Sequence, residues 1–160
     1  MADKVKMRDS IDIKKINLEY EKKIPEEFLK WALGKFSPKI ALASSFGAED
    51  VVLIDMLLSI DAAAVVFTLN TGRLNEETYE VMDRIRSKYK ISIQSYFPDA
   101  PKVEAIERTK GFYSFIESIE NRKECCGIRK VEPLNRALSG LDAWVTGLRR
   151  DQSVTRTGVE

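Results

Sequence analysis

The sequence predicts an α/β fold in which a parallel sheet is covered by helices on both faces. Short apolar runs alternate along the chain with longer segments of helical pattern, and turn residues separate them. The chain has 160 residues, of which 44% are hydrophobic and 32% charged, so it is large enough to bury one core. We find no repeat or low-complexity tract.

The N-terminal part of the chain has a helical pattern. Residues 1–35, rich in Lys and Glu, are predicted to be helical and peripheral to a domain formed by 36–160. Pro25 suits the first turn of a helix over 25–34, and Gly34 is its predicted terminator.

Strands and helices are expected to alternate in the rest of the chain. Residues 39–45 (KIALASS) form a short apolar run typical of a buried strand, and 48–60 are long and apolar enough for a buried helix. Further strands are predicted at 62–70, 91–97 and 142–147, and shorter helical stretches at 103–118 and 127–140.

The segment 75–89 (NEETYEVMDRIRSKY) has the strongest helical pattern. Asn75 can cap the helix, and the acidic residues after it suit the first turn. One face of this helix is apolar, formed by Met82, Ile85 and Tyr89.

The charge distribution favours a small anionic partner. The chain carries a net charge of +1, which argues against a general nucleic-acid binder. The segment from Arg122 to Arg156, however, contains eight basic residues and four acidic ones, so it is locally basic. No segment has the layout of a signal peptide, and no apolar run is long enough to cross a membrane, so we expect a cytoplasmic protein.

Three loops are candidates for binding that anion. In open α/β sheets ligands bind beyond the carboxyl ends of the strands, where this chain has 44–50 (SSFGAED), 69–74 (LNTGRL) and 146–158. The first loop offers hydroxyls and the N–H groups of a helix start, although an ordinary strand-to-helix turn has the same pattern. The others offer arginines, namely Arg73 in one and Arg149, Arg150 and Arg156 in the other.

Cys125 and Cys126 are adjacent and surrounded by charged residues. Their Cα atoms are about 3.8 Å apart, below the usual range of disulfides, so a bridge between them would be strained. Charged neighbours on both sides also fit poorly with a buried structural thiol. A thiolate activated by nearby cations and one half of a metal or cluster site both remain open.

Four motifs, taken together, resemble the sulfonucleotide reductases of sulfate assimilation, members of the adenine nucleotide alpha-hydrolase-like superfamily with a modified PP-loop. They are SSFGAEDVVLIDM, LNTGRLNEETY, CCGIRKVEPLNRAL and AWVTGLRRDQSVTR, within residues 36–158. The Cys-Cys pair resembles that of the iron–sulfur branch, the adenylylsulfate (APS) reductases.

The resemblance implies a function and a set of site residues. The reaction would be reduction of APS, or of its 3′-phosphorylated form (PAPS), to sulfite through a cysteine S-sulfonate that thioredoxin or glutaredoxin resolves. Cys125 and Cys126 would be two of four ligands to a [4Fe–4S] cluster, and Lys130 and Arg129 would lie between cluster and substrate. The implied substrate-binding residues are Ser44, Ser45, Phe46, Gly47, Asn70, Thr71, Gly72, Arg73, Arg149, Arg150 and Arg156.

The sequence departs from the family pattern in two respects. It has no histidine and no third cysteine, so the family's nucleophilic motif and second cysteine pair are missing. We therefore expect the N-terminal, nucleotide-binding part of a longer reductase. Asn70 also stands where the family usually has Asp.

Several alternatives remain. The chain could be a nucleotide-binding fragment without activity, or a relative of the ATP-pyrophosphatases or adenylyltransferases, although those predict a loop richer in glycine. A zinc-linked dimer with two cysteines from each chain is a third reading. The choice between APS and PAPS, the thiol donor and a homo-oligomeric state are open.

Overall fold

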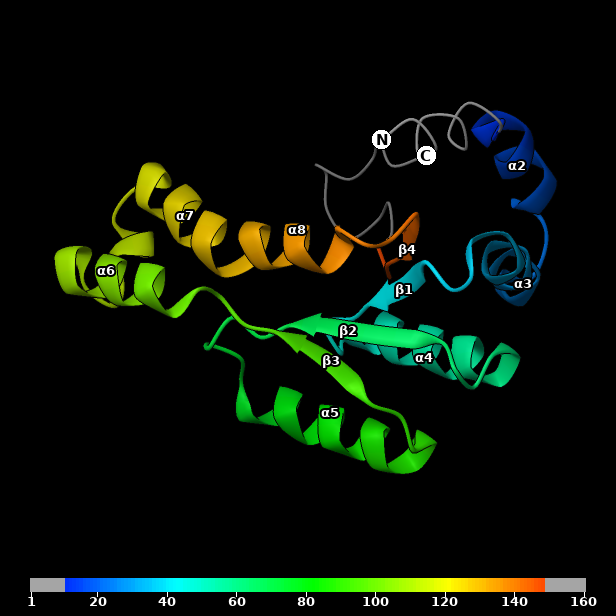
Figure 1. The fold of residues 1–160 in the computed structure, drawn as a ribbon, viewed down its shortest axis with the longest axis horizontal. Coiled ribbons are helices and arrows are strands. Elements are labelled where there is room, and N and C mark those ends of the chain that lie inside the picture. The colour runs from blue at the N-terminus through cyan, green and yellow to red at the C-terminus, as the bar shows by residue number, and fades with distance from the viewer. Residues whose placement is uncertain (1–10, 149–160) are drawn as a thin grey trace.

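The computed structural model describes residues 11–148 as helices packed around a parallel sheet (Figure 1). The strands are β1 (Ile40–Ala43), β2 (Val65–Leu69), β3 (Ile93–Tyr96) and β4 (Ala143–Val145). The α-helices are α2 (Ile13–Tyr20), α3 (Pro25–Phe36), α4 (Ala48–Ile60), α5 (Glu76–Tyr89), α6 (Ala100–Lys110), α7 (Ile119–Cys126) and α8 (Glu132–Leu138). A short 3₁₀ helix, η1 (Ser114–Ile116), and a π-helical turn, η2 (Gly127–Val131), complete the elements.

All strand pairs in the sheet are parallel, and the strand order is β3-β2-β1-β4. Alternate residues of β1 and β2 point to opposite faces, as the pleat of a strand requires. Ile40, Leu42 and Val66 face one core with α4, whereas Ala41 and Phe67 face a second core with α8. The predicted α/β class, with a parallel sheet covered on both faces, is therefore confirmed.

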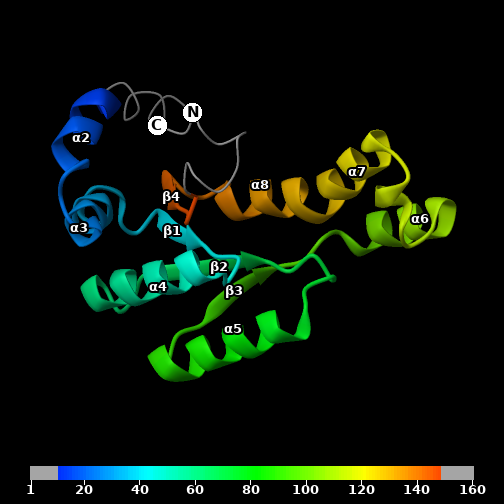
Figure 2. The same cartoon turned by 180° about the vertical axis from the view of Figure 1, so that it is seen from behind.

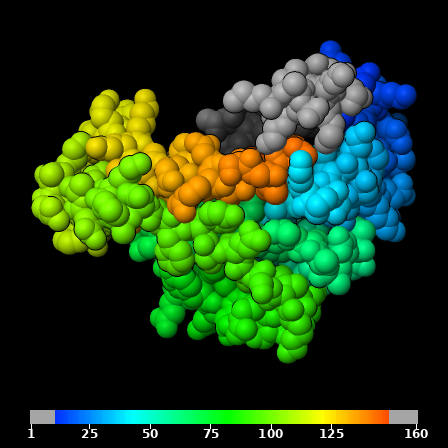
Figure 3. All heavy atoms as spheres, viewed as in Figure 1, coloured from blue at the N-terminus to red at the C-terminus, as the bar shows by residue number. Residues whose placement is uncertain are grey.

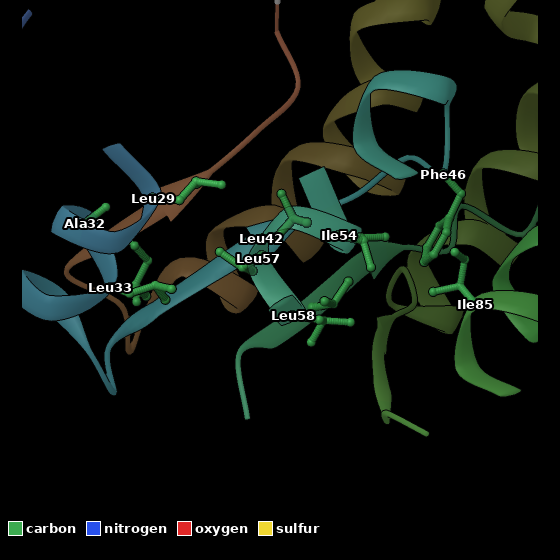
Figure 4. Packing of buried hydrophobic residues seen from close by; sticks show 11 residues of the cluster. Leu29, Ala32, Leu33, Leu42, Phe46, Ile54, Leu57, Leu58 and Ile85 are labelled. Carbon is green, nitrogen blue, oxygen red and sulfur yellow. The ribbon is translucent and has the colours of Figure 1, made fainter. Parts of the chain in front are cut away.

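The larger core lies between the sheet and the helices α3, α4 and α5 (Figure 4). Leu42 and Ile54 are fully buried at its centre, and Ile85 of α5 closes one end. The smaller core lies under α8, where Ala137 packs against Ala41 and Phe67. Figure 2 shows α8 on the side of the sheet opposite α4 and α5.

The N-terminal helices differ in their burial. No residue of α2 is buried, whereas α3 contributes Leu29, Ala32 and Leu33 to the main core, so α3 is not peripheral. The predicted end of this helix at Gly34 is wrong. The helix continues to Phe36, whose ring contacts that of Trp31, and Pro38 follows two residues later.

The helix predicted at 103–118 also has different bounds. It begins at Ala100, because the carboxylate of Asp99 accepts a hydrogen bond from Lys102 N at 3.1 Å. It ends at Lys110, before Gly111 with its positive φ of 80°, and only η1 of the remaining stretch is helical. Asn75 occupies the predicted N-cap position of α5, but its side chain makes no capping hydrogen bond.

A lobe formed by α6, η1 and α7 projects beyond the end of the sheet toward which the strand arrows point (Figures 1 and 3). From this lobe α7 leads into η2 and then α8, so that residues 119–138 form one run of helix. This run carries the cysteine pair at the end of α7 and Lys130, which lies at the carboxyl ends of the strands, a few residues later.

Candidate functional site

The strand order places a topological switch between β1 and β4. The chain leaves β1 toward β2 and β3 on one side, and β4 lies on the other side of β1. A crevice is expected at such a point, beyond the carboxyl ends of the strands. The structure has a cavity of about 410 Å³ there. Its lining comes from β1 and the start of α4 (Ala43, Ser44, Ser45, Glu49, Asp50), β2 and its loop (Phe67, Thr68, Leu69, Thr71, Leu74), η2 and α8 (Lys130, Leu134), and β4 with its loop (Trp144, Thr146, Gly147, Leu148).

The loop between β1 and α4 is held in a fixed shape by its own side chains. Phe46 has a positive φ of 60°, which is unusual for a residue with a bulky side chain. Its N–H donates to Ser44 Oγ at 3.0 Å, and its ring is buried beside Ile85 (Figure 4). The burial of the ring therefore fixes the backbone, and the next residue, Gly47, caps α4.

A buried carboxylate connects the two sides of the switch point. Asp50, 7% exposed, lies in the first turn of α4. Its Oδ2 accepts hydrogen bonds from Ser45 N at 2.6 Å and from Ser45 Oγ at 2.7 Å, and its Oδ1 accepts one from Gly147 N at 3.2 Å. Asp50 thus fixes the β1 loop and the β4 loop to each other. In this arrangement the two donors of Ser45 are already engaged.

The loop after β2 is shaped by Asn70 and Gly72. The Oδ1 atom of Asn70 accepts from Gly72 N at 3.1 Å and from the hydroxyl of Tyr79 at 2.9 Å. Asn70 is 5% exposed, and it is not among the residues that line the cavity. Gly72 has a φ of 73°, a conformation that glycine adopts without strain. Among the residues of this loop that were expected to bind substrate, Thr71 lines the cavity.

Arg73 and Arg129 lie beside the cavity but do not line it. Both guanidinium groups donate to the same carboxylate, that of Glu107 on α6. Arg129 also donates to Thr71 O at 2.8 Å, and Arg73 donates to Phe112 O and lies over the ring of Phe115. Contact between either arginine and a substrate, which the resemblance implied, stays a prediction.

Lys130 does line the cavity, and it differs sharply from its neighbour. Arg129 is 6% exposed, whereas Lys130 is exposed and has no ion-pair partner among residues 11–148. Both residues belong to the π-helical turn, in which Glu132 N donates to Gly127 O five residues back, and as neighbours on a helix their side chains point in different directions. Lys130 is therefore the cation that the described residues offer to an anion in the cavity.

Cys125 and Cys126 end α7, directly before the π-helical turn, and both are half-buried free thiols. Thiolates are the usual ligands of iron–sulfur clusters, which take about four. Within the described part of the chain, no group of three or more His, Cys, Asp or Glu side chains could hold a metal ion. The two thiols therefore fit one half of a cluster site and cannot form a whole one.

Some site residues were not found from the sequence. Asp50 stands in the quoted motif SSFGAED, but nothing there indicated that it would contact Gly147. Trp144 and Leu134 of the lining also stand in two of the motifs, but were not singled out as site residues. Glu107, beside the cavity, lies outside all four motifs, because its role depends on packing between distant elements. Arg149, Arg150 and Arg156 lie outside the described residues. Over 11–148, no helix is both long and apolar enough to cross a membrane.

Comparisons with known proteins agree on one family. The model of the phosphoadenosine phosphosulfate reductase domain matches residues 39–160. The chain is 45% identical over 153 residues to "5′-adenylylsulfate reductase 3, chloroplastic" of Arabidopsis thaliana, covering 96% of this chain and 33% of the relative. It is 48% identical over 124 residues to "Adenosine 5′-phosphosulfate reductase" of Burkholderia cepacia, covering 78% of this chain and 50% of the relative. The chain thus spans one third to one half of the length of these curated relatives.

A solved structure has the same fold. The crystal structure of phosphoadenylyl-sulfate (PAPS) reductase from Candida auris, a phosphate complex, superposes with a TM-score of 0.74. The superposition covers 89% of this chain and 71% of that chain, at 23% sequence identity. At that identity the likeness supports the fold alone.

Proposed function

This chain belongs to the phosphoadenosine phosphosulfate reductase domain family, and from that premise we propose that it forms the nucleotide-binding part of an assimilatory sulfonucleotide reductase. The proposed substrate is APS, with PAPS as the second candidate, because the named relatives above are adenylylsulfate reductases. The proposed products are sulfite and AMP. A cytoplasmic location and a homo-oligomeric state stay predictions.

The observation that carries the proposal is the cavity at the switch point. Its volume of about 410 Å³ lies within the usual range of small-molecule sites, roughly 300–1,000 Å³. Apolar side chains such as Leu69, Leu134 and Trp144 line part of it, which suits an aromatic base. Lys130 and the hydroxyls of Thr68 and Thr71 line another part, which suits the charged sulfate and phosphate groups; the lining also holds the carboxylates of Glu49 and Asp50.

In the proposed reaction a cysteine thiolate attacks the sulfur atom of APS. The bond from sulfur to the bridging oxygen breaks, and AMP leaves with its electron pair. A dithiol of thioredoxin or glutaredoxin then releases sulfite and becomes a disulfide, so that it supplies both electrons. Lys130 would stabilise the negative charge that develops on the leaving phosphate and the sulfonyl oxygens.

Cys125 and Cys126 would supply two thiolate ligands to a [4Fe–4S] cluster in this proposal. Their position at the end of α7 places both a few residues before Lys130 in one helical run, which supports a shared site. When bound, the cluster would tune the local electric field. Since both cysteines of the chain are assigned to it, the attacking thiolate and the remaining ligands would lie outside these 160 residues.

Titration calorimetry of the reduced, anaerobic chain tests the proposal. We expect binding of APS and AMP, with ATP weaker. Preference for ATP would instead support a relative of the ATP-pyrophosphatases or adenylyltransferases, and absence of binding to APS, PAPS, AMP and ATP would refute the proposed site. Iron and sulfide analysis of the same samples tests the ligand role of the cysteines, since zinc alone would favour a zinc-linked dimer.

A pair of lysine variants sharpens the test. Lys130→Ala should weaken AMP binding about tenfold, because one charge-assisted hydrogen bond is lost. Lys123→Ala removes an equal charge from α7, where the side chain is exposed and does not line the cavity, so it should leave the affinity unchanged. Equal effects of both substitutions would mean that net charge, rather than contact, governs binding.

A further inference from the structure

Glu107 on α6 joins three segments that are far apart in the sequence. Its carboxylate accepts hydrogen bonds from Arg129 of η2 and from Arg73 of the loop after β2, in the second case at 3.3 Å. Neither the sequence motifs nor the cavity lining includes Glu107.

The contact with Arg129 matters because that arginine is buried. Its side chain is 7% exposed, and Glu107 is its carboxylate partner. A buried guanidinium without a counter-charge is costly, so Glu107 is required to keep Arg129 in place. Arg129 in turn donates to Thr71 O at 2.8 Å, and this bond attaches η2 to the loop after β2.

The two segments that Glu107 joins both contribute residues to the cavity lining. Thr71 lines it from the loop, and Lys130, which follows Arg129, lines it from η2. Gly72, whose φ of 73° suits glycine, lies against Arg129, since a Cβ atom there would be in ordinary van der Waals contact with Nη1 at 3.5 Å. The distance across the cavity between the loop and Lys130 therefore depends on the Arg129 bridge, and the bridge depends on Glu107.

We propose that Glu107 is a positioning residue for the anionic end of the nucleotide, acting through Arg129 to set Lys130 and Thr71 at a fixed separation. The role of the nucleotide rests on the proposed function above. Glu107 also keeps Arg73 at the α6 side of the loop, where Phe112 O and the ring of Phe115 complete its contacts. Of the three cations described above within residues 11–148, namely Arg73, Arg129 and Lys130, Lys130 is then the one left to meet the ligand.

Glu107→Gln is the informative substitution, because it keeps the shape and removes the charge. Both guanidinium groups donate to the same oxygen, Oε1, so the amide oxygen of Gln can still accept both bonds, but the negative charge that neutralises the two arginines is lost. The two arginines, no longer neutralised, should repel each other and separate. Glu104→Gln is the matched control, since Glu104 is exposed on the same helix and has no ion pair within residues 11–148.

Two ligands separate a positioning role from a general loss of structure. AMP carries the phosphate and adenosine does not, so we expect Glu107→Gln to weaken AMP binding about tenfold and adenosine binding less than about twofold. Glu107→Asp, which restores the charge, should recover much of the AMP affinity. A Glu107→Gln variant that binds both ligands equally less well, or AMP as well as before, would overturn the proposal.

A second measurement does not depend on nucleotide binding. Amide hydrogen exchange in the native chain should become faster in residues 70–73 and in 127–131 together when Glu107 is replaced by Gln, and should not change in the Glu104→Gln control. Unchanged exchange in both segments would refute the bridge. If the wild-type chain binds neither AMP nor adenosine, the proposed function fails, and the exchange data alone decide whether Glu107 holds the two segments together.

Discussion

Replacing Asp50 by asparagine tests whether the two loops of the switch point are held together by one carboxylate. The side chain is 7% exposed and accepts three hydrogen bonds, from Ser45 N, Ser45 Oγ and Gly147 N. Asparagine has a single acceptor oxygen. If that oxygen takes the place of Oδ2, the amide NH₂ faces the N–H of Gly147, and this donor loses its partner.

The magnitude follows from the number of bonds affected. A hydrogen bond to a charged group contributes about 1.5–3 kcal/mol, and the two bonds that remain lose their charge assistance. We therefore expect Asp50→Asn to lower the free energy of unfolding by about 2–4 kcal/mol, a large part of the roughly 5–15 kcal/mol typical of a domain. The same substitution should weaken AMP binding, because both loops line the cavity.

Urea denaturation followed by circular dichroism measures the first effect, and calorimetry with AMP measures the second. Asp83→Asn is a suitable control, because Asp83 is an exposed carboxylate paired with Arg86 within one helix. That pair should contribute less than about 1 kcal/mol. A loss for Asp50→Asn no larger than for Asp83→Asn would refute the reasoning that Asp50 connects the loops.

Three further substitutions test other parts of the structure. Gly72→Ala should lower stability by about 1–2 kcal/mol in a thermal melt, because φ is 73° there and a residue with a Cβ atom is strained in that conformation; an unchanged Tm would contradict this. Leu42→Ala, at a fully buried position, should cost about 3–5 kcal/mol in urea denaturation, and a loss below about 1 kcal/mol would mean that the main core is not packed as described. Arg84→Ala breaks an exposed pair with Glu80 and should change stability by less than about 0.5 kcal/mol, so a larger loss would show that surface pairs matter more here than expected.

Apolar periodicity and capping residues predicted most of the helices and strands, because these signals come from residues close together in the sequence. The helix predicted at 48–60 coincides with α4, and the pattern of 75–89 gave α5 with Asn75 at its N-cap. Errors arose where a local signal competed with packing. Gly34 favours the end of a helix, but the contact of Phe36 with Trp31 extends α3 past it. Residues 119–126 were not assigned to any element, and they form α7, which carries the cysteines.

Part of the candidate site was also predictable from the sequence. The rule for parallel sheets placed the loops 44–50 and 69–74 at one edge, and the cavity includes residues from both. The resemblance favoured Lys130 over Arg129 as the contact, but periodicity and charge could not show which of these two adjacent cations faces that cavity. Packing decides it, because Arg129 is buried in its contacts with Thr71 O and Glu107, whereas Lys130 stays exposed.

By itself, the amino-acid sequence determined the α/β class, the order of most elements and the family resemblance, because periodicity and motifs are properties of neighbouring residues. Only the tertiary structure decided that Asp50 connects the β1 and β4 loops, and that Glu107 takes both Arg73 and Arg129. These contacts join residues 97, 34 and 22 positions apart, and hydrogen bonds of this kind exist only once the sheet has brought their partners together.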